Sequence, residues 1–320
     1  MKTALITGGA GFVGSYLIDE LTDNQIEVSI TKLKGEPFDN IKVRAVYNLD
    51  ITNPVQIEDV LNASTPDYIF HLAAQSSVAK SWSEPAETMS INAIGTINLL
   101  EAVRKIDKKV RILLVGSGEE YGFVKPDEVP VSETNLLRPG NIYAASKAVQ
   151  GMIGQIYSRA YGMEIIMVRA FNHIGPGQSP MFVVADFAKQ IAEIEKGLAE
   201  PVMRVGNLEA KRDFTDVRDV VRGYRLLIEQ GKTGEYYNIG SGKSVAIRDM
   251  LNELLSMSDV KIELHQAQDK VRPLDAPVIE ADIQKIVIDI GWKQEISMKL
   301  SLIDTLQCWR RIINERISDG

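Results

Sequence analysis

Short apolar runs alternate with longer segments of helical periodicity along the first half of the chain. Compact apolar runs are typical of buried strands, and the periodic segments between them of amphipathic helices. Strand and helix therefore follow one another in turn, which predicts a parallel sheet with helices on both faces. The predicted strands are Lys2–Thr7, Glu27–Thr31, Lys42–Val46, Tyr68–Leu72, Arg111–Gly116 and Glu164–Arg169, and the helices include Pro54–Leu61, Ala86–Ile106 and Ile142–Tyr161.

The second half of the chain is less regular. Gly and Pro in the stretch Phe171–Gly177 predict a loop that leaves the sheet. We expect residues 1–170 to form one domain and residues 171–320 mainly a smaller mixed α/β lobe, with parts of 205–240 returning to the first domain. Its predicted strands are Val202–Val205, Glu235–Ile239 and Val260–Leu264, and its helices are Phe182–Lys196, one ending at Gln230, Ile247–Leu255 and Leu300–Ile317.

Composition narrows the class of protein. The 320 residues are 45% hydrophobic and 25% charged, as in an ordinary globular protein, and the net charge of −7 argues against binding nucleic acid or an anionic membrane. No apolar run is long enough to span a membrane, and the first apolar run is too short for a signal peptide, so we expect a cytoplasmic protein. The only cysteine, Cys308, and three scattered histidines argue against a disulfide framework and a metal site. Of these histidines, His71 lies in an apolar strand and is predicted to be a core residue.

A glycine-rich turn joins the first strand to the first helix. Gly8, Gly11 and Gly14 punctuate Gly8-Gly9-Ala10-Gly11-Phe12-Val13-Gly14, and a helical pattern follows. The first two glycines let the backbone approach a pyrophosphate, which the helix N-terminus stabilises, and Gly14 lets the helix pack on the strand. A glycine turn without a ligand is the alternative. The strand–glycine–helix order favours dinucleotide binding, and hence a Rossmann-type, doubly wound α/β domain.

The end of the second strand bears on the choice of dinucleotide. An acid there would bind the ribose 2′-hydroxyl of NAD, but the chain has Thr31-Lys32-Leu33-Lys34 instead. Lys32 or Lys34 would suit a 2′-phosphate, so NADP(H) is expected, with NAD(H) as the alternative. Equally open is that both lysines are solvated loop charges.

Other strand ends place further candidates around the same ligand. Asp50 is placed to reach the adenine amino group, and the small residues Ala73 and Ala74 leave room for a cofactor. Asn92, in the predicted helix Ala86–Ile106, is expected to brace the nearby backbone with its amide.

Three side chains suggest proton transfer. Ser117 ends a buried strand, and Tyr143 and Lys147 are four residues apart on one predicted helix, so they share a face. A free phenol titrates near pH 10, and a neighbouring ammonium ion would bring it closer to a working range. By itself a Tyr-x-x-x-Lys pair is a weak signal, because most such pairs are ordinary helix positions.

Taken together, the ordered motifs resemble the extended short-chain dehydrogenase/reductase family, whose members modify nucleotide sugars. The motifs run through the whole chain: the glycine turn, Asp50-Ile51, Leu72-Ala73-Ala74, Ser117 before Tyr121-Gly122, Tyr143-x-x-x-Lys147, Arg169-x-Phe171-Asn172, Arg212-Asp213-Phe214-x-x-Val217-x-Asp219, Arg272-Pro273 and Gly291-Trp292.

The resemblance implies a role for each matching residue. Tyr143 is the expected acid/base, Lys147 the residue that lowers its pKa and holds the nicotinamide ribose, and Ser117 the hydroxyl on the substrate oxygen. The expected cofactor-binding set is Gly8, Gly11, Phe12, Val13, Gly14, Lys32, Asp50, Ile51, Leu72, Ala73, Ala74, Asn92, Tyr143 and Lys147. The expected substrate-binding set is Gln75, Ser76, Glu119, Asn172, Arg212 and Arg272. Asn172 and the two arginines, which lie in predicted loops, are expected to hold the diphosphate. Structural salt bridges are the alternative for each arginine.

Within the family, His71-Leu72-Ala73-Ala74-Gln75-Ser76-Ser77-Val78 is similar to the branch that acts on GDP-mannose. That branch contains 4,6-dehydratases and reductases of their 4-keto product. A dehydratase needs a carboxylate two residues after the hydroxyl, and Glu119 stands there; a solvated or paired loop carboxylate is the alternative. Gly118, Ser117 and the stretch Asn172–Pro180 look more like the reductases.

The resemblance therefore implies NAD(P)H-dependent reduction of the 4-keto group of GDP-4-keto-6-deoxy-D-mannose to GDP-D-rhamnose. The alternatives are a GDP-mannose 4,6-dehydratase that uses Glu119 and a nucleotide-sugar 4-epimerase. A nucleotide-binding sensor without catalysis is less favoured, because an idle site need not keep Ser117, Tyr143 and Lys147 together. The amphipathic helices near 86–106 and 142–161 lead us to expect a homodimer.

Overall fold

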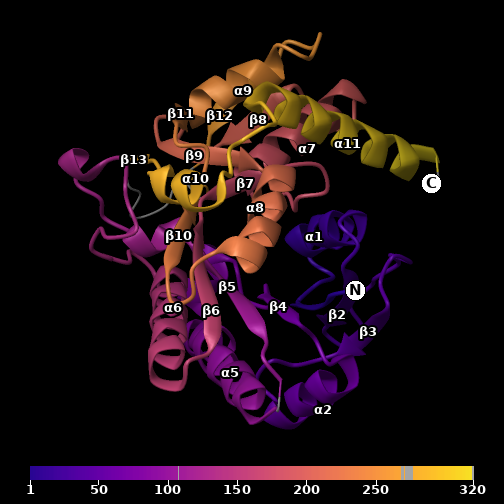
Figure 1. The fold of residues 1–320 in the computed structure, drawn as a ribbon. Helices are drawn as coiled ribbons and strands as arrows, with labels where there is room; N and C mark the ends of the chain where they lie inside the picture. Colours follow the sequence, from indigo (N-terminus) through magenta and orange to yellow (C-terminus); the bar gives the residue numbers. More distant parts are fainter. Residues whose placement is uncertain (107, 268–269, 271–276, 319–320) are drawn as a thin grey trace.

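The computed structural model describes residues 1–106, 108–267, 270 and 277–318 of the chain. Two lobes are visible in Figure 1, with the N-terminal half of the chain in the lower lobe and most of the C-terminal half above it. Arg272, predicted to bind the diphosphate, lies outside the described residues.

The lower lobe is built on a seven-stranded sheet in the order β10-β6-β5-β4-β1-β2-β3. Every neighbouring pair is parallel, so the Rossmann-type doubly wound α/β fold is confirmed. Its strands are β1 (Thr3–Thr7), β2 (Glu27–Lys32), β3 (Ala45–Asn48), β4 (Tyr68–His71), β5 (Arg111–Ser117), β6 (Glu164–Ala170) and β10 (Tyr236–Ile239). The predicted edge strand at 42–46 lies three residues too early, because the apolar pattern there is short.

Helices cover both faces of this sheet. On one face α1 (Phe12–Asp23) and α8 (Val217–Gln230) pack on the strands, and on the other α2 (Pro54–Ser64), α5 (Gly95–Lys105) and α6 (Ile142–Tyr161) do so. Buried aliphatic side chains fill both layers, as expected for a sheet that is buried on its two faces. The face under α1 and α8 also holds Tyr224, Tyr237 and Trp292. The carboxyl ends of the strands therefore remain as the place for a ligand.

The predicted helix over 86–106 is divided into three parts. α4 (Pro85–Met89) continues into a π-helical turn (Ser90–Ile94) and then into α5, and a short α3 (Val78–Ser83) precedes them. A π turn inserts one extra residue, and such turns are common at functional sites. Here the turn contains the fully buried Asn92.

The upper lobe has a four-stranded sheet, in which β11 (Ser244–Ala246), β13 (Val278–Ile279) and β7 (Asn172–Ile174) all pair with β9 (Lys211–Asp216). A second sheet joins β8 (Val202–Val205) to β12 (Glu263–Gln266). The helices are α7 (Val183–Glu195), α9 (Ile247–Leu255), α10 (Gln284–Ile290) and α11 (Met298–Ser318). Residues of α7, α9 and α11 enclose a separate apolar core.

Three predictions in this lobe are wrong. The stretch Phe171–Gly177 is not wholly a loop, because Asn172–Ile174 forms β7, and Arg212 lies in β9 rather than in a loop. In both cases pairing between β7 and β9 outweighs the local turn composition. The strand predicted at 260–264 is also shifted, to β12.

The chain crosses between the lobes more than once. β10 returns to the lower sheet and pairs with β6, after β7, β8 and β9 have been placed in the upper lobe. A domain boundary at residue 170 stays a prediction. Among the described residues, no helix is long and apolar enough to cross a membrane.

Candidate active site

The turn after β1 is shaped for close approach of a ligand to the backbone. Gly8 adopts φ +68°, and a Cβ there would lie 2.8 Å from the Ala73 Cα. A Cβ on Gly14 would overlap the Gly9 carbonyl, whereas one on Gly11 would meet nothing closer than 3.5 Å. Gly11 is the N-cap of α1, and no side chain caps that helix end. The first N–H groups of α1 are thus left for an anion such as a pyrophosphate.

The ribose end of the predicted cofactor site lies where β2 and β3 end. Lys32 is half-buried, and its Nζ donates to the Glu36 carbonyl at 2.6 Å, whereas Lys34 is exposed. Asp50 is exposed, and its Oδ1 accepts from the Thr52 hydroxyl at 2.7 Å. Both predicted contacts with the cofactor stay predictions. Ile51 is buried in the core.

Asn92 braces the loop that follows β4. Its Oδ1 accepts from the Gln75 backbone N–H at 2.8 Å and its Nδ2 donates to the Gln75 carbonyl at 3.0 Å. The same Nδ2 donates to the Ser146 hydroxyl at 2.8 Å, which ties this loop to α6. The expected bracing is therefore present. Asn92 shapes the wall of the site through Gln75.

Gln75 and Ser76, both predicted to bind substrate, lie in different settings. The Gln75 amide donates to the Ser77 carbonyl at 2.9 Å and to Thr88 Oγ1 at 3.0 Å, and its oxygen accepts from the Ser77 N–H. Its side chain thus holds the loop in shape. Ser76 is exposed. His71 is a core residue, as predicted, because Thr7 and Thr96 engage its two ring nitrogens at 2.8 and 3.1 Å.

Ser117 and Tyr143 come together at the carboxyl end of β5. The Ser117 side chain acts on the Tyr143 phenol and lowers its pKa. Tyr143 lies in the first turn of α6, which Asn141 caps by accepting from the Ala144 N–H at 2.8 Å. A strand end and a capped helix start therefore hold the two hydroxyls in one place, which suits acid catalysis on a carbonyl oxygen.

The electrostatics of Tyr143 differ from the expectation. Burial raises the pKa of Tyr143 to about 12, the Ser117 side chain acts in the opposite direction, and the charges of Glu119 and Glu120 raise the pKa further. Lys147 is not among the groups that shift this pKa, and its Nζ donates to the Val115 carbonyl at 2.8 Å and to Gln150 Oε1 at 2.9 Å. In this arrangement Tyr143 is a protonated acid.

Lys147 is itself perturbed. Burial lowers the pKa of its ammonium group to about 8, and the charge of Glu120 acts in the opposite direction. Only 4% of the residue is exposed. The ammonium form still predominates at pH 7, but its pKa lies close enough to that pH for a further charge or hydrogen bond from a ligand to change its protonation.

Glu119 lies two residues after Ser117 and is half-buried. Its backbone N–H donates to the Ser117 hydroxyl at 3.2 Å, and its Oε2 accepts from Asn141 Nδ2 at 3.4 Å. The carboxylate therefore faces the start of α6, the same element that carries Tyr143.

A buried pair was not among the predicted site residues. Glu120 Oε1 accepts from the Ser117 backbone N–H at 2.8 Å, and Glu120 Oε2 accepts from Arg169 Nε at 2.9 Å. In a sequence, two adjacent acidic residues such as Glu119 and Glu120 are typical of an exposed surface. The Ser-x-x-Glu spacing of a capping box was the signal that could have found Glu120.

The upper lobe contains two of the predicted site residues, one on β7 and one on β9. Asn172 Nδ2 donates to the Asp213 carbonyl at 3.2 Å, which ties the two strands together. Arg212 is 7% exposed, and its Nη1 donates to the Lys211 carbonyl at 2.8 Å. Asp213 is fully buried and accepts backbone N–H groups of Ser241, Gly242 and Ala281. Diphosphate binding by Asn172 and Arg212 stays a prediction.

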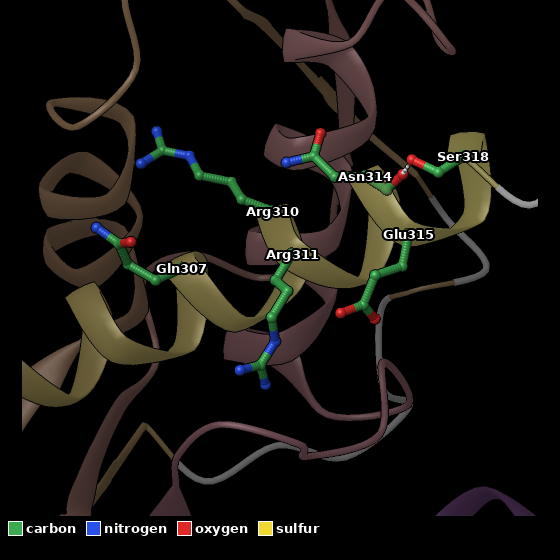
Figure 2. Close-up of a pocket in the computed structure, with 6 residues that line it drawn as sticks. All are labelled: Gln307, Arg310, Arg311, Asn314, Glu315 and Ser318. Atoms are coloured by element: carbon green, nitrogen blue, oxygen red, sulfur yellow. Dashed lines mark hydrogen bonds between the residues drawn. The ribbon is translucent and has the colours of Figure 1, made fainter.

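Other parts of the described chain offer no comparable chemistry. No group of three or more His, Cys, Asp or Glu side chains that could hold a metal ion occurs among the described residues. A hollow along α11, shown in Figure 2, contains none of the predicted site residues; it is lined by Gln307, Arg310, Arg311, Asn314, Glu315 and Ser318. Arg310 there pairs with Glu195 at 2.7 Å.

Comparison with known proteins agrees with this geometry. Residues 5–305 match the family described as GDP-mannose 4,6 dehydratase. The chain belongs to this family. Members of it are NAD(P)-dependent enzymes of the extended short-chain dehydrogenase/reductase type that modify nucleotide sugars, so the resemblance inferred from the motifs is confirmed.

Individual relatives carry different activities. The chain is 33% identical over 310 residues to GDP-6-deoxy-D-mannose reductase of Pseudomonas aeruginosa, covering 97% of this chain and 98% of that protein. It is 31% identical to a GDP-mannose 4,6-dehydratase of Yersinia enterocolitica, covering 82% of this chain and 74% of the relative.

Solved structures show the same fold. The structure of RMD from Pseudomonas aeruginosa complexed with NADPH has a TM-score of 0.87 and 31% identity, covering 98% of this chain and all of that one. UDP-glucose 4-epimerase of Thermus thermophilus in complex with NAD has a TM-score of 0.86 and 27% identity, covering 96% of this chain and 99% of that one.

Proposed function

We propose that the protein reduces the 4-keto group of GDP-4-keto-6-deoxy-D-mannose to give GDP-D-rhamnose. The observation that carries this proposal is the end-to-end match to the Pseudomonas aeruginosa GDP-6-deoxy-D-mannose reductase, which spans 97% of this chain and 98% of the relative. The matched dehydratase of Yersinia enterocolitica is spanned to 74% of its length, and that of Sinorhizobium fredii is spanned to 93% at a lower identity of 28%.

The chain's own residues account for the proton in this reaction. A bound nicotinamide coenzyme supplies the hydride for C4 of the sugar. The Tyr143 hydroxyl gives its proton to the keto oxygen as that oxygen gains negative charge, and the Ser117 hydroxyl donates a hydrogen bond to the same oxygen. Because burial keeps the pKa of Tyr143 high, the phenol is protonated before the reaction starts.

For the coenzyme we propose NADPH, with the pyrophosphate at the N-terminus of α1. The uncapped helix end and the room at Gly11 support this placement. Lys147 would hold the nicotinamide ribose, and Lys32, half-buried at the end of β2, would face a 2′-phosphate. A strong preference for NADH in steady-state turnover would contradict the proposed contact between Lys32 and a 2′-phosphate.

A second candidate is the 4,6-dehydratase, which one specific observation favours. A dehydratase needs a base for the C5 proton and an acid for the C6 hydroxyl, and Glu119 lies beside Tyr143 at the start of α6. In the proposed reductase no proton at C5 moves. Glu119 then orients the sugar.

A two-arm assay distinguishes these activities. Purified protein receives GDP-mannose without added reductant in one arm, and GDP-4-keto-6-deoxy-mannose with NADPH in the other. The proposal predicts no change in the first arm and consumption of NADPH in the second. Formation of the keto sugar in the first arm would identify a dehydratase, and interconversion of sugar epimers without net use of NADPH would identify a 4-epimerase.

We also propose that two copies of the chain associate through α6 and the neighbouring α5. Met152 and Ile156, four residues apart on one face of α6, are 50% and 60% exposed. Ile94 and Tyr161, at 50% and 55% exposure, extend the apolar surface. Large exposed apolar side chains gathered on neighbouring helices are typical of an association surface.

A further inference from the structure

The Glu120–Arg169 ion pair adjoins the active site and is almost completely shielded from water. The two side chains are 1% and 5% exposed. Removing two charges from water costs several kcal/mol per ion, and an apolar pair of similar size is often as stable. The pair therefore requires an explanation other than stability.

Neighbouring residues are arranged to admit the Glu120 carboxylate. A Cβ on Gly116 would overlap Glu120 Oε1, so the glycine at this position of β5 leaves room for the carboxylate. On the other side, the Arg169 guanidinium lies between two aromatic rings, 4.9 Å from the centroid of Tyr121 and 4.2 Å from that of Tyr236. Stacking of this kind fixes the orientation of the guanidinium plane.

Hydrogen bonds hold the rest of Arg169 in place. Its Nη1 donates to Tyr121 Oη at 3.1 Å and to the Glu133 carbonyl at 3.1 Å. Tyr121 in turn donates to Asn238 Oδ1 at 2.6 Å. Because Arg169 cannot move freely, the Glu120 carboxylate that it binds is also fixed.

Glu120 affects the active site in two ways, through a hydrogen bond and through its charge. Its Oε1 accepts from the Ser117 N–H, so it determines the position of the Ser117 backbone. Its charge acts on Lys147 and Tyr143 from α6 and on Tyr236 from β10. Arg169 opposes that charge from β6.

We propose that Glu120 is a positioning residue of the active site, whose carboxylate fixes Ser117 against Tyr143 and provides the counter-charge to Lys147. The kinetic part of this inference rests on the proposed reductase function. Glu120 acts through Ser117 and Lys147 and does not touch the substrate.

The first test replaces the pair by apolar side chains, in the double variant Glu120→Leu/Arg169→Met. No unpaired charge is left buried, so the variant is expected to fold. The proposal predicts that kcat falls about tenfold to a hundredfold, since small misplacements of catalytic groups cost this much, with little change in KM. The alkaline limb of the kcat profile should move to lower pH, because loss of the anion lowers the pKa of Tyr143.

A second variant, Glu120→Asp, separates position from charge. The shorter side chain keeps the negative charge beside Arg169 but withdraws from the Ser117 N–H. We expect a loss of kcat without the shift in the alkaline limb. A matched control is the Glu195→Leu/Arg310→Met variant, because that pair joins α7 to α11 away from the site, and its kcat should equal that of the wild type.

Wild-type kcat and an unchanged pH profile in the folded double variant would overturn the proposal. If the wild-type protein itself does not reduce the keto sugar, the proposed function fails and hydrogen–deuterium exchange decides the role of Glu120. Faster exchange confined to residues 115–122 in Glu120→Asp supports positioning of Ser117. Exchange identical to the wild type in that segment overturns it.

Discussion

At the scale of single residues, Tyr143 is the proton donor of the proposed reaction. Burial raises its pKa to about 12, and the Ser117 side chain acts in the opposite direction. Lys147, which the resemblance assigns to lowering that pKa, instead contacts Val115 and Gln150. The protonated phenol is the form that reduction of a ketone requires, whereas oxidation would need the phenolate.

Replacement of Tyr143 by phenylalanine tests this directly. Tyr143→Phe removes the proton donor and leaves the ring, so NADPH-dependent reduction should fall by about a hundredfold or more. Binding of the nucleotide sugar, measured by calorimetry, should remain close to that of the wild type. Turnover of the variant at the wild-type rate would refute the assignment of Tyr143.

Lys147 makes the stability of the protein depend on pH. Its pKa is lowered from 10.5 to about 8 in the folded state, so between these values the unfolded chain binds more protons. Stability therefore rises with pH across this window, and Lys147 contributes on the order of 2 kcal/mol between pH 7 and 9.5.

The variant Lys147→Met should lose this pH-dependent part. Urea denaturation at the two pH values should show the free energy of unfolding rising more in the wild type than in the variant. An equal change in both proteins would mean that Lys147 titrates normally in the folded state.

At the scale of elements, two glycines of the turn between β1 and α1 are expected to have different roles, Gly14 in folding and Gly11 in binding the coenzyme. A Cβ on Gly14 meets the Gly9 backbone, whereas a Cβ on Gly11 has room in the protein itself. Gly11→Ala should therefore fold and yet bind NADPH about tenfold more weakly or worse, because the methyl group occupies the approach to the pyrophosphate.

Two measurements check that prediction. Circular dichroism and thermal unfolding report the fold of Gly11→Ala, and quenching of protein fluorescence reports the affinity for NADPH. Gly14→Ala is the contrasting variant and should be destabilised as well. Wild-type affinity in Gly11→Ala would place the pyrophosphate elsewhere.

Elements with complete local signals were predictable from sequence. α6 spans Ile142–Tyr161 as predicted, because Asn141 caps its start and Gly162 ends it in the left-handed region at φ +66°. β7 was not, since it has only three residues before a Gly and Pro loop and its partner β9 lies about 40 residues away. Pairing of that kind depends on contacts that no local pattern contains.

The site was predictable to the same extent. Ser117, Tyr143 and Lys147 follow from strand ends and helix spacing, and the structure brings the first two close enough for Ser117 to lower the pKa of Tyr143. The direction of Lys147 and the part played by Glu120 depend on partners from three different elements. Local spacing carries no information about them.

At the scale of the whole molecule, the proposed dimer places two active sites on one particle. Association through α6 would bury Met152 and Ile156, which are otherwise half or more exposed. Met152→Lys/Ile156→Lys places charges on that face and should convert the dimer to a monomer, as measured by sedimentation or light scattering. A wild-type protein that is monomeric at micromolar concentration would contradict the proposal.

At this scale, both lobes contribute residues to the predicted site. The lower lobe has the glycine turn, Ser117 and Tyr143, and the upper lobe has Asn172 and Arg212. Under the proposed function, coenzyme and sugar would meet at the carboxyl ends of the strands. A reductase transfers one hydride in one direction, whereas a dehydratase or an epimerase returns the hydride that it removes.

Deuterium transfer from the coenzyme to the sugar distinguishes these reactions in one measurement. The protein is incubated with GDP-4-keto-6-deoxy-mannose and NADPH carrying deuterium at the transferable position, and the product is examined by NMR. We expect a GDP-6-deoxyhexose with one deuterium at C4 and one NADPH consumed for each product molecule. An unreacted keto sugar, or a product without deuterium at C4, would show that the protein is not the proposed reductase.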